Sequence, residues 1–295
     1  MRDDQGGTLQ QRRHAGGGRY DGAAAVLATR HDKLPLIAPA LAPLGMAVQV
    51  ADVDTDSLGT FTGEVERPAD QWDTAVAKAR LGMRSTGSLL GLASEGSIGS
   101  HPAMPYIASA TELVVLVDDE LGIVVGETEV SFDIVVVSFT TGPGEPLDGS
   151  LQRADFPGHG LIVMPSLGSG GPIVKGIHDE AALHEAIALC ATASSDGRAR
   201  VSTDLRAHQC PSRRPIITAA TARLAARLAA CCPACDTPGW GIVRAERGAP
   251  CAECGDLVDI VVAHVEGCQR CPVELRMPLA DRATADPARC PSCNP

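Results

Sequence analysis

Apolar and polar residues alternate in short blocks along the chain, and these blocks predict an α/β fold. Short apolar runs at residues 23–29, 46–52 and 89–94 have the length and polar flanks of buried strands. Apolar residues at helical spacing after Pro68 predict a helix between the second and third runs. Polar segments separate the blocks, so we expect strands and helices in alternation.

The downstream pattern continues this alternation. Residues 111–132 predict a hairpin with its turn near Asp119–Gly122, and residues 159–165 and 172–177 predict short strands. Residues 200–208 predict a strand that leads into a loop. Helices are predicted at 179–194 and from Pro211. The stretch 31–44 has helical apolar spacing but carries three prolines, so a kinked or frayed helix is expected. The whole predicts a mixed-sheet α/β sandwich.

Composition divides the chain into three parts. Residues 1–22 are rich in Gly, Gln and Arg and read as a disordered leader, and residues 23–230 form the α/β domain. Residues 231–295 form a small Cys-rich module. Aromatic residues are only 3% of the chain, so the core must consist of Ala, Val, Leu and Ile. No apolar run is long enough to span a membrane and no secretory signal is visible, which predicts a cytoplasmic protein.

The formal net charge of −11 disfavours binding to nucleic acid or to acidic membranes. Among the basic residues, 22 are Arg and three are Lys, namely Lys33, Lys78 and Lys175. Lysine is a compact charge that suits phosphate, so each of the three is a candidate ligand-binding residue. The alternative is that they are ordinary solvated surface residues.

Eight cysteines near the C-terminus form four CxxC pairs, which predict metal binding. They are Cys232, Cys235, Cys251, Cys254, Cys268, Cys271, Cys290 and Cys293. Two residues between thiolates allow both to reach one tetrahedral metal, so two structural Zn²⁺ sites with four thiolates each are expected. An iron–sulfur cluster is the main alternative. Sequential pairing of the CxxC motifs is favoured, with nested and alternating pairings left open. The module has nine acidic residues against six arginines, which favours a protein partner over nucleic acid.

Polar residues cluster after the first three predicted strands, where ligands bind in open α/β sheets. Hydroxyls, backbone amides and Lys33 suit phosphate, and carboxylates suit Mg²⁺ bridging that phosphate. Candidate catalytic residues are Glu95, Glu64 and Asp204. Candidate ligand-binding residues in these three loops are Thr29, Arg30, His31, Lys33, Thr62, Ser97 and His101.

A basic element at residues 198–227 has seven arginines and one acidic residue. Arg206, His208 and Arg213 lie around the predicted start of the last helix, which is itself an anion-binding end. A solvated arginine face is the alternative, and it accounts better for Arg223 and Arg227 than for this loop cluster.

Several motifs are similar to those of an uncharacterised bacterial family known only as a domain of unknown function. They are "ATRHDK", "GTFTGEVERP", "ASEGSIGSHP", "TDLRAH", the CxxC tail and the terminal "CNP". This resemblance implies no activity. The chain departs from the family pattern at Cys210, where the pattern has Asn.

Residues 24–132 also resemble inosine/xanthosine triphosphatases. The resemblance rests on "LATRHDK", "TAVAKARLGM", "LLGLASEGSIG" and "LVVLVDDELGIVVG", with Ser97 in place of a second glycine. It implies a triphosphatase-like fold, with Glu95 holding Mg²⁺ or positioning water. Thr29, Lys33 and Lys78 would then bind the triphosphate.

Two classes of function follow. The favoured one is Mg²⁺-dependent hydrolysis of a nucleoside triphosphate or another phosphorylated small molecule, with a structural zinc tail. The alternative is a non-enzymatic nucleotide- or partner-binding protein with zinc ribbons.

Overall fold

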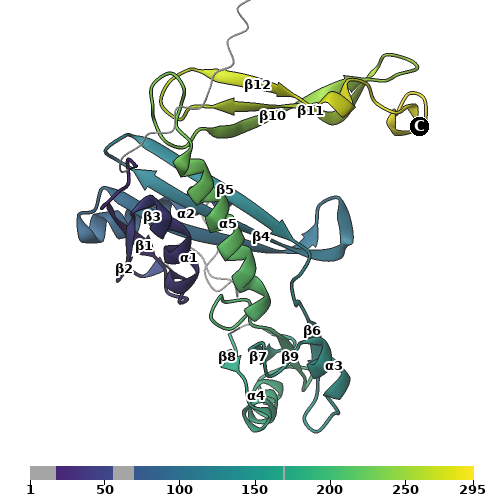
Figure 1. Cartoon of the computed structure of the whole chain (residues 1–295). Coiled ribbons are helices and arrows are strands. Elements are labelled where there is room, and N and C mark those ends of the chain that lie inside the picture. The colour runs from purple at the N-terminus through teal and green to yellow at the C-terminus, as the bar shows by residue number, and fades with distance from the viewer. Residues whose placement is uncertain (1–17, 56–69, 169) are drawn as a thin grey trace, which may run out of the picture.

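A computed structural model describes residues 18–55, 70–168 and 170–295, and it contains three β-sheets (Figure 1). A five-stranded sheet lies at the centre, a four-stranded sheet lies at one end, and a three-stranded ribbon lies at the other. The predicted α/β class with a mixed sheet and a Cys-rich C-terminal region is confirmed. No helix in the described ranges is long and apolar enough to cross a membrane.

The central sheet has the strand order β2-β1-β3-β4-β5. Its bounds are β1 Ala24–Ala28, β2 Ala47–Ala51, β3 Leu90–His101, β4 Met104–Asp118 and β5 Ile123–Ser131. Strand β1 runs parallel to β2 and β3, whereas β3, β4 and β5 are antiparallel, so the sheet is mixed. The parallel part brings the carboxyl ends of β1, β2 and β3 to one edge, as the sequence predicted.

Helices cover both faces of this sheet. Helix α2 (Gln71–Thr86) starts at Asp70, whose side chain accepts a hydrogen bond from Asp73 N, and packs on one face. Helices α1 (Leu34–Leu41) and α5 (Arg214–Ala229) pack on the other face. The proline-rich stretch forms the eight-residue α1 followed by a 3-10 turn, η1 (Ala42–Leu44). Its prolines therefore shorten the helix without preventing it.

The four-stranded sheet has its own hydrophobic core. Its order is β6-β9-β7-β8, with β6 Ser138–Thr141, β7 Leu161–Pro165, β8 Val174–Ile177 and β9 Ala199–Thr203. Helices α3 (Asp148–Arg153) and α4 (Glu180–Thr192) accompany it, and Leu183, Ile187 and Cys190 of α4 are fully buried. The stretch predicted as one α/β domain thus contains two sheets with separate core clusters.

Helix α5 joins the parts of the molecule. It follows the 3-10 turn η3 (Pro211–Arg213) beside the four-stranded sheet and runs along the central sheet to the ribbon (Figure 1). The ribbon consists of β10 (Gly241–Pro250), β11 (Leu257–Gly267) and β12 (Glu274–Pro278), all antiparallel. Two 3-10 turns follow, η4 (Ala280–Arg282) and η5 (Pro287–Arg289).

One prediction about β3 is wrong. Residues 95–101 were expected to form a Gly/Ser loop, but they continue the strand, which pairs with β4 from Leu90↔Asp118 to Ser100↔Ala108. The Gly and Ser residues lower strand propensity locally, and the long β4 partner overrides that preference. Glu95 therefore lies on a strand and not on a flexible turn.

Candidate functional site

Lys33 lies buried where the loop after β1 meets β3. Its ammonium donates hydrogen bonds to the backbone oxygen of Ser94 at 2.9 Å and to Ser94 Oγ at 2.8 Å. Burial, followed by the nearby positive charge of Arg213, lowers the pKa of Lys33 to about 8. A lysine held this way is a compact charge at the carboxyl end of a parallel strand, where anionic ligands bind.

Lys78 reaches the neighbouring residue from the other side of the sheet. Its Nζ forms a 2.5 Å ion pair with Glu95 Oε1, and both side chains are buried. Gln71, at the start of the same helix, donates to the backbone oxygens of Glu95 and Thr111. Successive side chains of a strand point to opposite faces, so Lys33 contacts Ser94 on the α1/α5 face and Lys78 contacts Glu95 on the α2 face.

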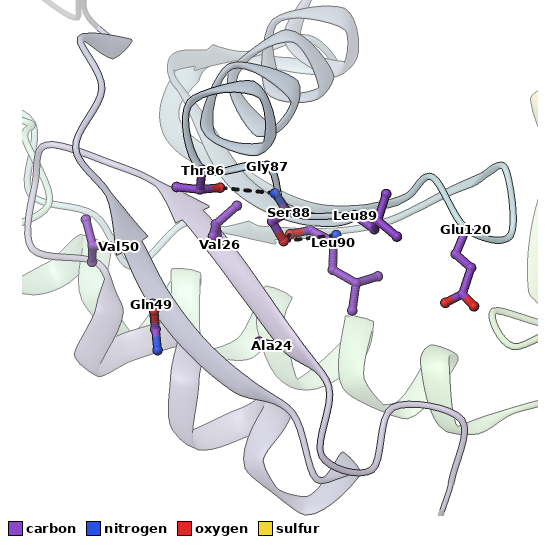
Figure 2. Close-up of a pocket in the computed structure, with 10 residues that line it drawn as sticks. All are labelled: Ala24, Val26, Gln49, Val50, Thr86, Gly87, Ser88, Leu89, Leu90 and Glu120. Carbon is purple, nitrogen blue, oxygen red and sulfur yellow. Dashed lines mark hydrogen bonds between the residues drawn. The ribbon is translucent and has the colours of Figure 1, made fainter.

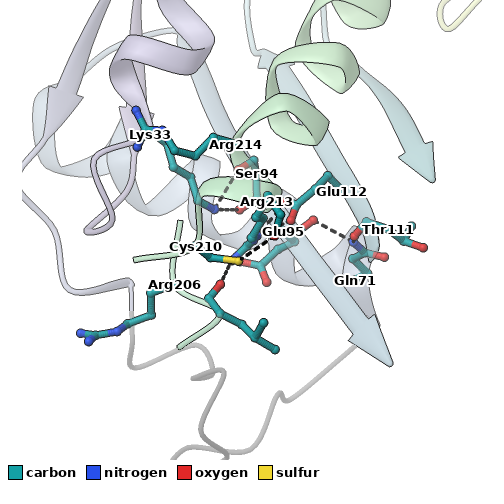
Figure 3. A network of polar contacts seen from close by, with 12 residues as sticks. Lys33, Gln71, Ser94, Glu95, Thr111, Glu112, Arg206, Cys210, Arg213 and Arg214 are labelled. Atoms are coloured by element: carbon teal, nitrogen blue, oxygen red, sulfur yellow. Dashed lines mark hydrogen bonds and ion pairs between the residues drawn. The ribbon is translucent and has the colours of Figure 1, made fainter. Parts of the chain in front are cut away.

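A third buried cation, Arg213, lies over β3 and β4 (Figure 3). Its guanidinium pairs with Glu112 of β4 and donates to the backbone oxygen of Leu205 at 2.7 Å. Neither Arg213 nor Glu112 is exposed. Gly96 is directly opposite Glu112 in the strand pairing, and a Cβ at Gly96 would collide with both charged groups. Glycine is thus required here so that the guanidinium can lie on the sheet.

The loop from Asp204 to Gln209 brings further charged groups to this place. Arg206 donates to both oxygens of Asp204, and the backbone N–H of Gly176 donates to Asp204 Oδ2 at 3.1 Å. The ring of His208 stacks on that of His31 with centroids 5.3 Å apart. Burial and the charge of Lys33 lower the pKa of His31 to about 3, so its ring is neutral at pH 7. We name the region formed by residues 29–33, 94–96 and 204–214, together with Gln71, Lys78 and Glu112, the junction.

Many of the predicted site residues lie in the junction, and others lie outside it. Those brought together are His31, Lys33, Lys78, Glu95, Asp204, Arg206, His208 and Arg213. Lys175 lies on β8, next to Gly176 in the sequence. Thr29 Oγ1 accepts from the N–H of His31, and Arg30 pairs with Asp54 at 2.6 Å beside this loop. Thr62 and Glu64 lie outside the described residues.

Two predicted residues of β3 lie further along the strand. Ser97 is exposed, two residues beyond Glu95. His101 lies at the far end of β3, where its ring contacts that of Phe132 with centroids 5.2 Å apart. At about 3.3 Å per strand residue, His101 is roughly 20 Å from Glu95. It was expected in the loop after the third predicted strand, and the extended strand β3 carries it away from Glu95.

Glu112 and Gln71 belong to the junction but were not predicted. A charged residue at the start of the apolar run that leads to Val117 was a usable signal for Glu112, since a buried carboxylate needs a partner. Gln71 had no comparable signal, because a polar residue in the first turn of a helix is ordinary.

His159 also escaped prediction, and it connects three segments of the chain. Its Nδ1 lies 3.0 Å from Asp155 Oδ2, and its Nε2 accepts from the N–H of Ser212 and lies 2.9 Å from Ser212 Oγ. Ser212 Oγ in turn accepts from the N–H of Val135. Each of these polar atoms has a partner, and the arrangement holds the link from β5 to β6 against the turn that precedes α5.

A shallow groove of about 450 Å³ lies elsewhere on the central sheet (Figure 2). Ala24 at the start of β1, the edge strand β2 and the end of α2 line it, with Ser88 and Glu120 among its polar groups. Lys33 follows the opposite end of β1, so this groove is separate from the junction.

The cysteines form two clusters, each able to hold a metal ion. One consists of Cys232, Cys235, Cys268 and Cys271, and the other of Cys251, Cys254, Cys290 and Cys293. Within each cluster all Sγ atoms lie within 4.8 Å of one another. Sγ–Sγ separations are 3.6 Å in the first cluster and 3.6 and 3.8 Å in the second. A tetrahedral Zn²⁺ with Zn–S bonds of about 2.3 Å needs Sγ atoms about 3.8 Å apart, so the donor sets fit this ion.

The CxxC motifs pair in alternation, and the favoured sequential pairing is wrong. The first motif precedes β10 and the second follows it, and the ten-residue strand between them separates the two motifs by about 30 Å. Antiparallel β11 returns the chain so that Gly267 pairs with Gly241, which brings the third motif to the first. Strand β12 then runs back, and the fourth motif joins the second.

A mixed α/β protein with a buried charged junction and two four-cysteine clusters is thus defined. The model of the family described as a domain of unknown function, DUF6671, matches residues 78–295, and the chain belongs to this family. No curated protein and no solved structure matches the chain, and the resemblance to triphosphatases stays a prediction.

Proposed function

We propose that the junction binds a phosphorylated small molecule, with a nucleoside triphosphate as the first candidate, and that the protein hydrolyses it with Mg²⁺. One observation carries the proposal. In a chain with three lysines among 25 basic residues, two lysines are buried and reach the adjacent residues Ser94 and Glu95. Burying an ammonium is costly, so two such groups at adjacent residues of β3 favour a role in ligand binding.

The residues of the junction have different roles in this proposed reaction. The Lys33 ammonium is the phosphate-binding charge, and Arg206 and His208 extend the polar surface on the facing loop. Lys78 orients the Glu95 side chain through its 2.5 Å ion pair. Carboxylate oxygens are the ligands that Mg²⁺ takes, and Glu95 would hold this ion on the α2 face. A triphosphate bound to Lys33 on the other face would reach Glu95 around the edge of β3, beyond the end of its short pairing with β1.

We further propose that both four-cysteine clusters hold Zn²⁺ in a structural role. Four thiolates fill the tetrahedral coordination sphere and leave no position for substrate. The ribbon has a small core of Ala249, Val258, Ala285 and two of the cysteines. Such a core is too small to fold the module without metal.

The second candidate is a non-enzymatic nucleotide- or partner-binding protein. It is favoured by the ion pairs of the junction, because Glu95, Glu112 and Asp204 each have a cationic partner. Carboxylates engaged in this way need rearrangement before they can orient water.

The test is a turnover assay on inosine, xanthosine and ordinary nucleoside triphosphates with Mg²⁺, with released phosphate and pyrophosphate measured. We expect turnover of at least one triphosphate and a loss of about 10²-fold or more in Glu95→Gln. Glu185→Gln, on the exposed face of α4, is the matched control and should retain full activity.

The outcomes separate the two candidates. Calorimetric binding of a triphosphate without turnover would favour the non-enzymatic function. Turnover that Glu95→Gln leaves unchanged would place the reaction elsewhere and contradict the proposed role of the junction.

A further inference from the structure

A buried histidine connects a carboxylate to a serine hydroxyl where the four-stranded sheet meets α5. His159 is 2% exposed, and its Nδ1 lies 3.0 Å from Asp155 Oδ2. Its Nε2 lies 2.9 Å from Ser212 Oγ, across a sequence separation of 53 residues. An acid, a histidine and a serine in this order of contacts form the arrangement of nucleophilic hydrolases, which is recognised by geometry and not by position in the sequence.

The backbone fixes which ring nitrogen of His159 carries the proton. The N–H of Ser212 lies 3.2 Å from Nε2 and can only donate, so Nε2 accepts and carries no proton. The proton is therefore on Nδ1, which donates it to the Asp155 carboxylate. Nε2 is then a base in contact with the Ser212 hydroxyl. This is the tautomer that a histidine needs to take the proton of a serine.

The surrounding backbone holds the carboxylate and the hydroxyl in this geometry. Asp155 has a φ of 51°, in the left-handed region, and its backbone oxygen accepts from the N–H of His159 at 2.9 Å. A Cβ at Gly158 would lie only 3.2 Å from Asp155 Oδ2, so glycine leaves room for the carboxylate. On the other side, the N–H of Val135 donates to Ser212 Oγ at 3.1 Å. Because Val135 supplies one proton to this oxygen, the hydroxyl's own proton points to His159.

The serine is placed where a small molecule can reach it. Ser212 is half-buried and keeps part of its surface in solvent, whereas the ring of His159 is shielded from water. Helix α5 begins at Arg214, two residues further on, and the positive end of this 16-residue helix favours negative charge that develops beside it. The residue between them, Arg213, pairs with Glu112 in the junction, so the turn η3 contributes to both places.

We propose that Ser212, His159 and Asp155 form a serine esterase site for small carboxylic esters, in addition to the proposed hydrolysis of phosphorylated molecules. Ser212 Oγ attacks the carbonyl carbon and forms an Oγ–C bond, while its proton moves to His159 Nε2. The bond from that carbon to the alcohol oxygen breaks, and the leaving alkoxide takes the proton from Nε2. Water then attacks the acyl-serine through the same base, which releases the carboxylic acid and returns the proton to Ser212. Asp155 is the positioning residue that keeps the ring in its tautomer.

The test treats the full, zinc-loaded chain with a fluorophosphonate probe in the absence of Mg²⁺ and triphosphate. An activated serine attacks the phosphorus of this probe, so an Oγ–P bond forms and fluoride leaves. Peptide mass spectrometry should find the probe on Ser212, and the chain should hydrolyse p-nitrophenyl acetate. Ser212→Ala should abolish both results. The matched control is Ser88→Ala, at a half-buried serine whose hydroxyl bonds the backbone oxygen of Leu90, and it should leave both unchanged.

The roles of the other two residues appear in the rate of labelling. His159→Gln should slow the labelling of Ser212 by about 10²-fold or more, because the general base is lost. Asp155→Asn should lower the maximal labelling rate and leave the probe concentration at half-maximal rate unchanged. Circular dichroism and zinc content check that each variant is folded.

Two outcomes would overturn the proposal. One is a native chain that carries no probe on Ser212, a result that depends on no variant. The other is labelling of Ser212 that His159→Gln leaves unchanged. Either result would assign the three residues to holding the fold alone. Because the assay contains neither Mg²⁺ nor triphosphate, its failure would leave the proposed hydrolysis of phosphorylated molecules unaffected.

Discussion

At the scale of single residues, the junction depends on side chains that are unusual for their positions. Gly96 has no side chain, which leaves room for Arg213 to pair with Glu112 on the sheet. Lys33 is buried beside Ser94. Removing one member of a buried ion pair typically costs about 3–5 kcal/mol, because the other charge is left without a partner. These residues therefore contribute to the stability of the fold.

Gly96→Ala is expected to lower the free energy of unfolding by about 1–3 kcal/mol, because the added methyl group collides with the Arg213–Glu112 pair. Urea denaturation followed by circular dichroism measures the change. Gly99→Ala is the matched control on the same strand, since no atom lies within 4 Å of its added Cβ. Equal stabilities of the two variants would contradict the close approach at Gly96.

The pKa of Lys33, lowered to about 8, predicts a pH dependence of stability. Between pH 8 and the ordinary lysine value of about 10.5, the unfolded chain binds the proton and the folded chain does not. The contribution of Lys33 to the free energy of unfolding should therefore rise with pH across this window. The difference between the native chain and Lys33→Met, measured by urea denaturation at several pH values, should show this rise, and a constant difference would refute it.

At the scale of elements, the lengths of the strands determine the geometry of the cysteine clusters and of the junction. The length of β10 holds the first and second CxxC motifs apart, and the antiparallel return of β11 selects the third motif as the partner of the first. In the same way, the extension of β3 to His101 carries that residue away from Glu95.

Cys232→Ser is expected to reduce the zinc content from two ions to one, because it removes a ligand from only one cluster. Its three former partners, Cys235, Cys268 and Cys271, should become reactive toward iodoacetamide, as read by peptide mass spectrometry. Cys251 and Cys254 serve as internal controls and should remain protected. Their alkylation in place of Cys268 and Cys271 would indicate sequential pairing and contradict the alternating arrangement.

The sequence predicted most elements because their signals are local. Helix α4 begins at the capping residue Asp179, and its apolar spacing identified the buried Leu183. The metal-ligand set followed from the CxxC spacing, but its pairing did not, because that depends on strand contacts between distant segments. Strand β6 carries a short and weakly patterned sequence, and it forms by pairing with β9.

The junction was partly predictable, because some of its residues carry local sequence signals. Rare lysines and polar residues at strand ends marked Lys33, Lys78 and Glu95. Their placement on opposite faces of β3 depends on how far that strand extends. The glycine-rich sequence after Ser94 predicted a loop and so gave no indication that the strand continues. The contact between Arg213 and Glu112 spans a sequence separation of 101 residues, which no local pattern can reveal.

At the scale of the whole molecule, the junction lies where three parts of the chain meet. The loop after β1, strand β3 of the central sheet and the loop that leads from β9 of the four-stranded sheet into α5 all contribute to it. The ribbon is attached at the far end of α5, where Arg227 donates to the backbone oxygen of Gly239 and pairs with Glu127. A ligand at the junction would thus contact both sheets at once.

Hydrogen exchange with a non-hydrolysable nucleoside triphosphate analogue and Mg²⁺ tests most directly whether a phosphorylated ligand binds at the junction. Binding at the junction should slow exchange in residues 29–33, 94–96 and 204–214, and Lys33→Met should abolish that effect. Slower exchange confined to residues 86–90 at the shallow groove, or no change anywhere in the chain, would contradict it.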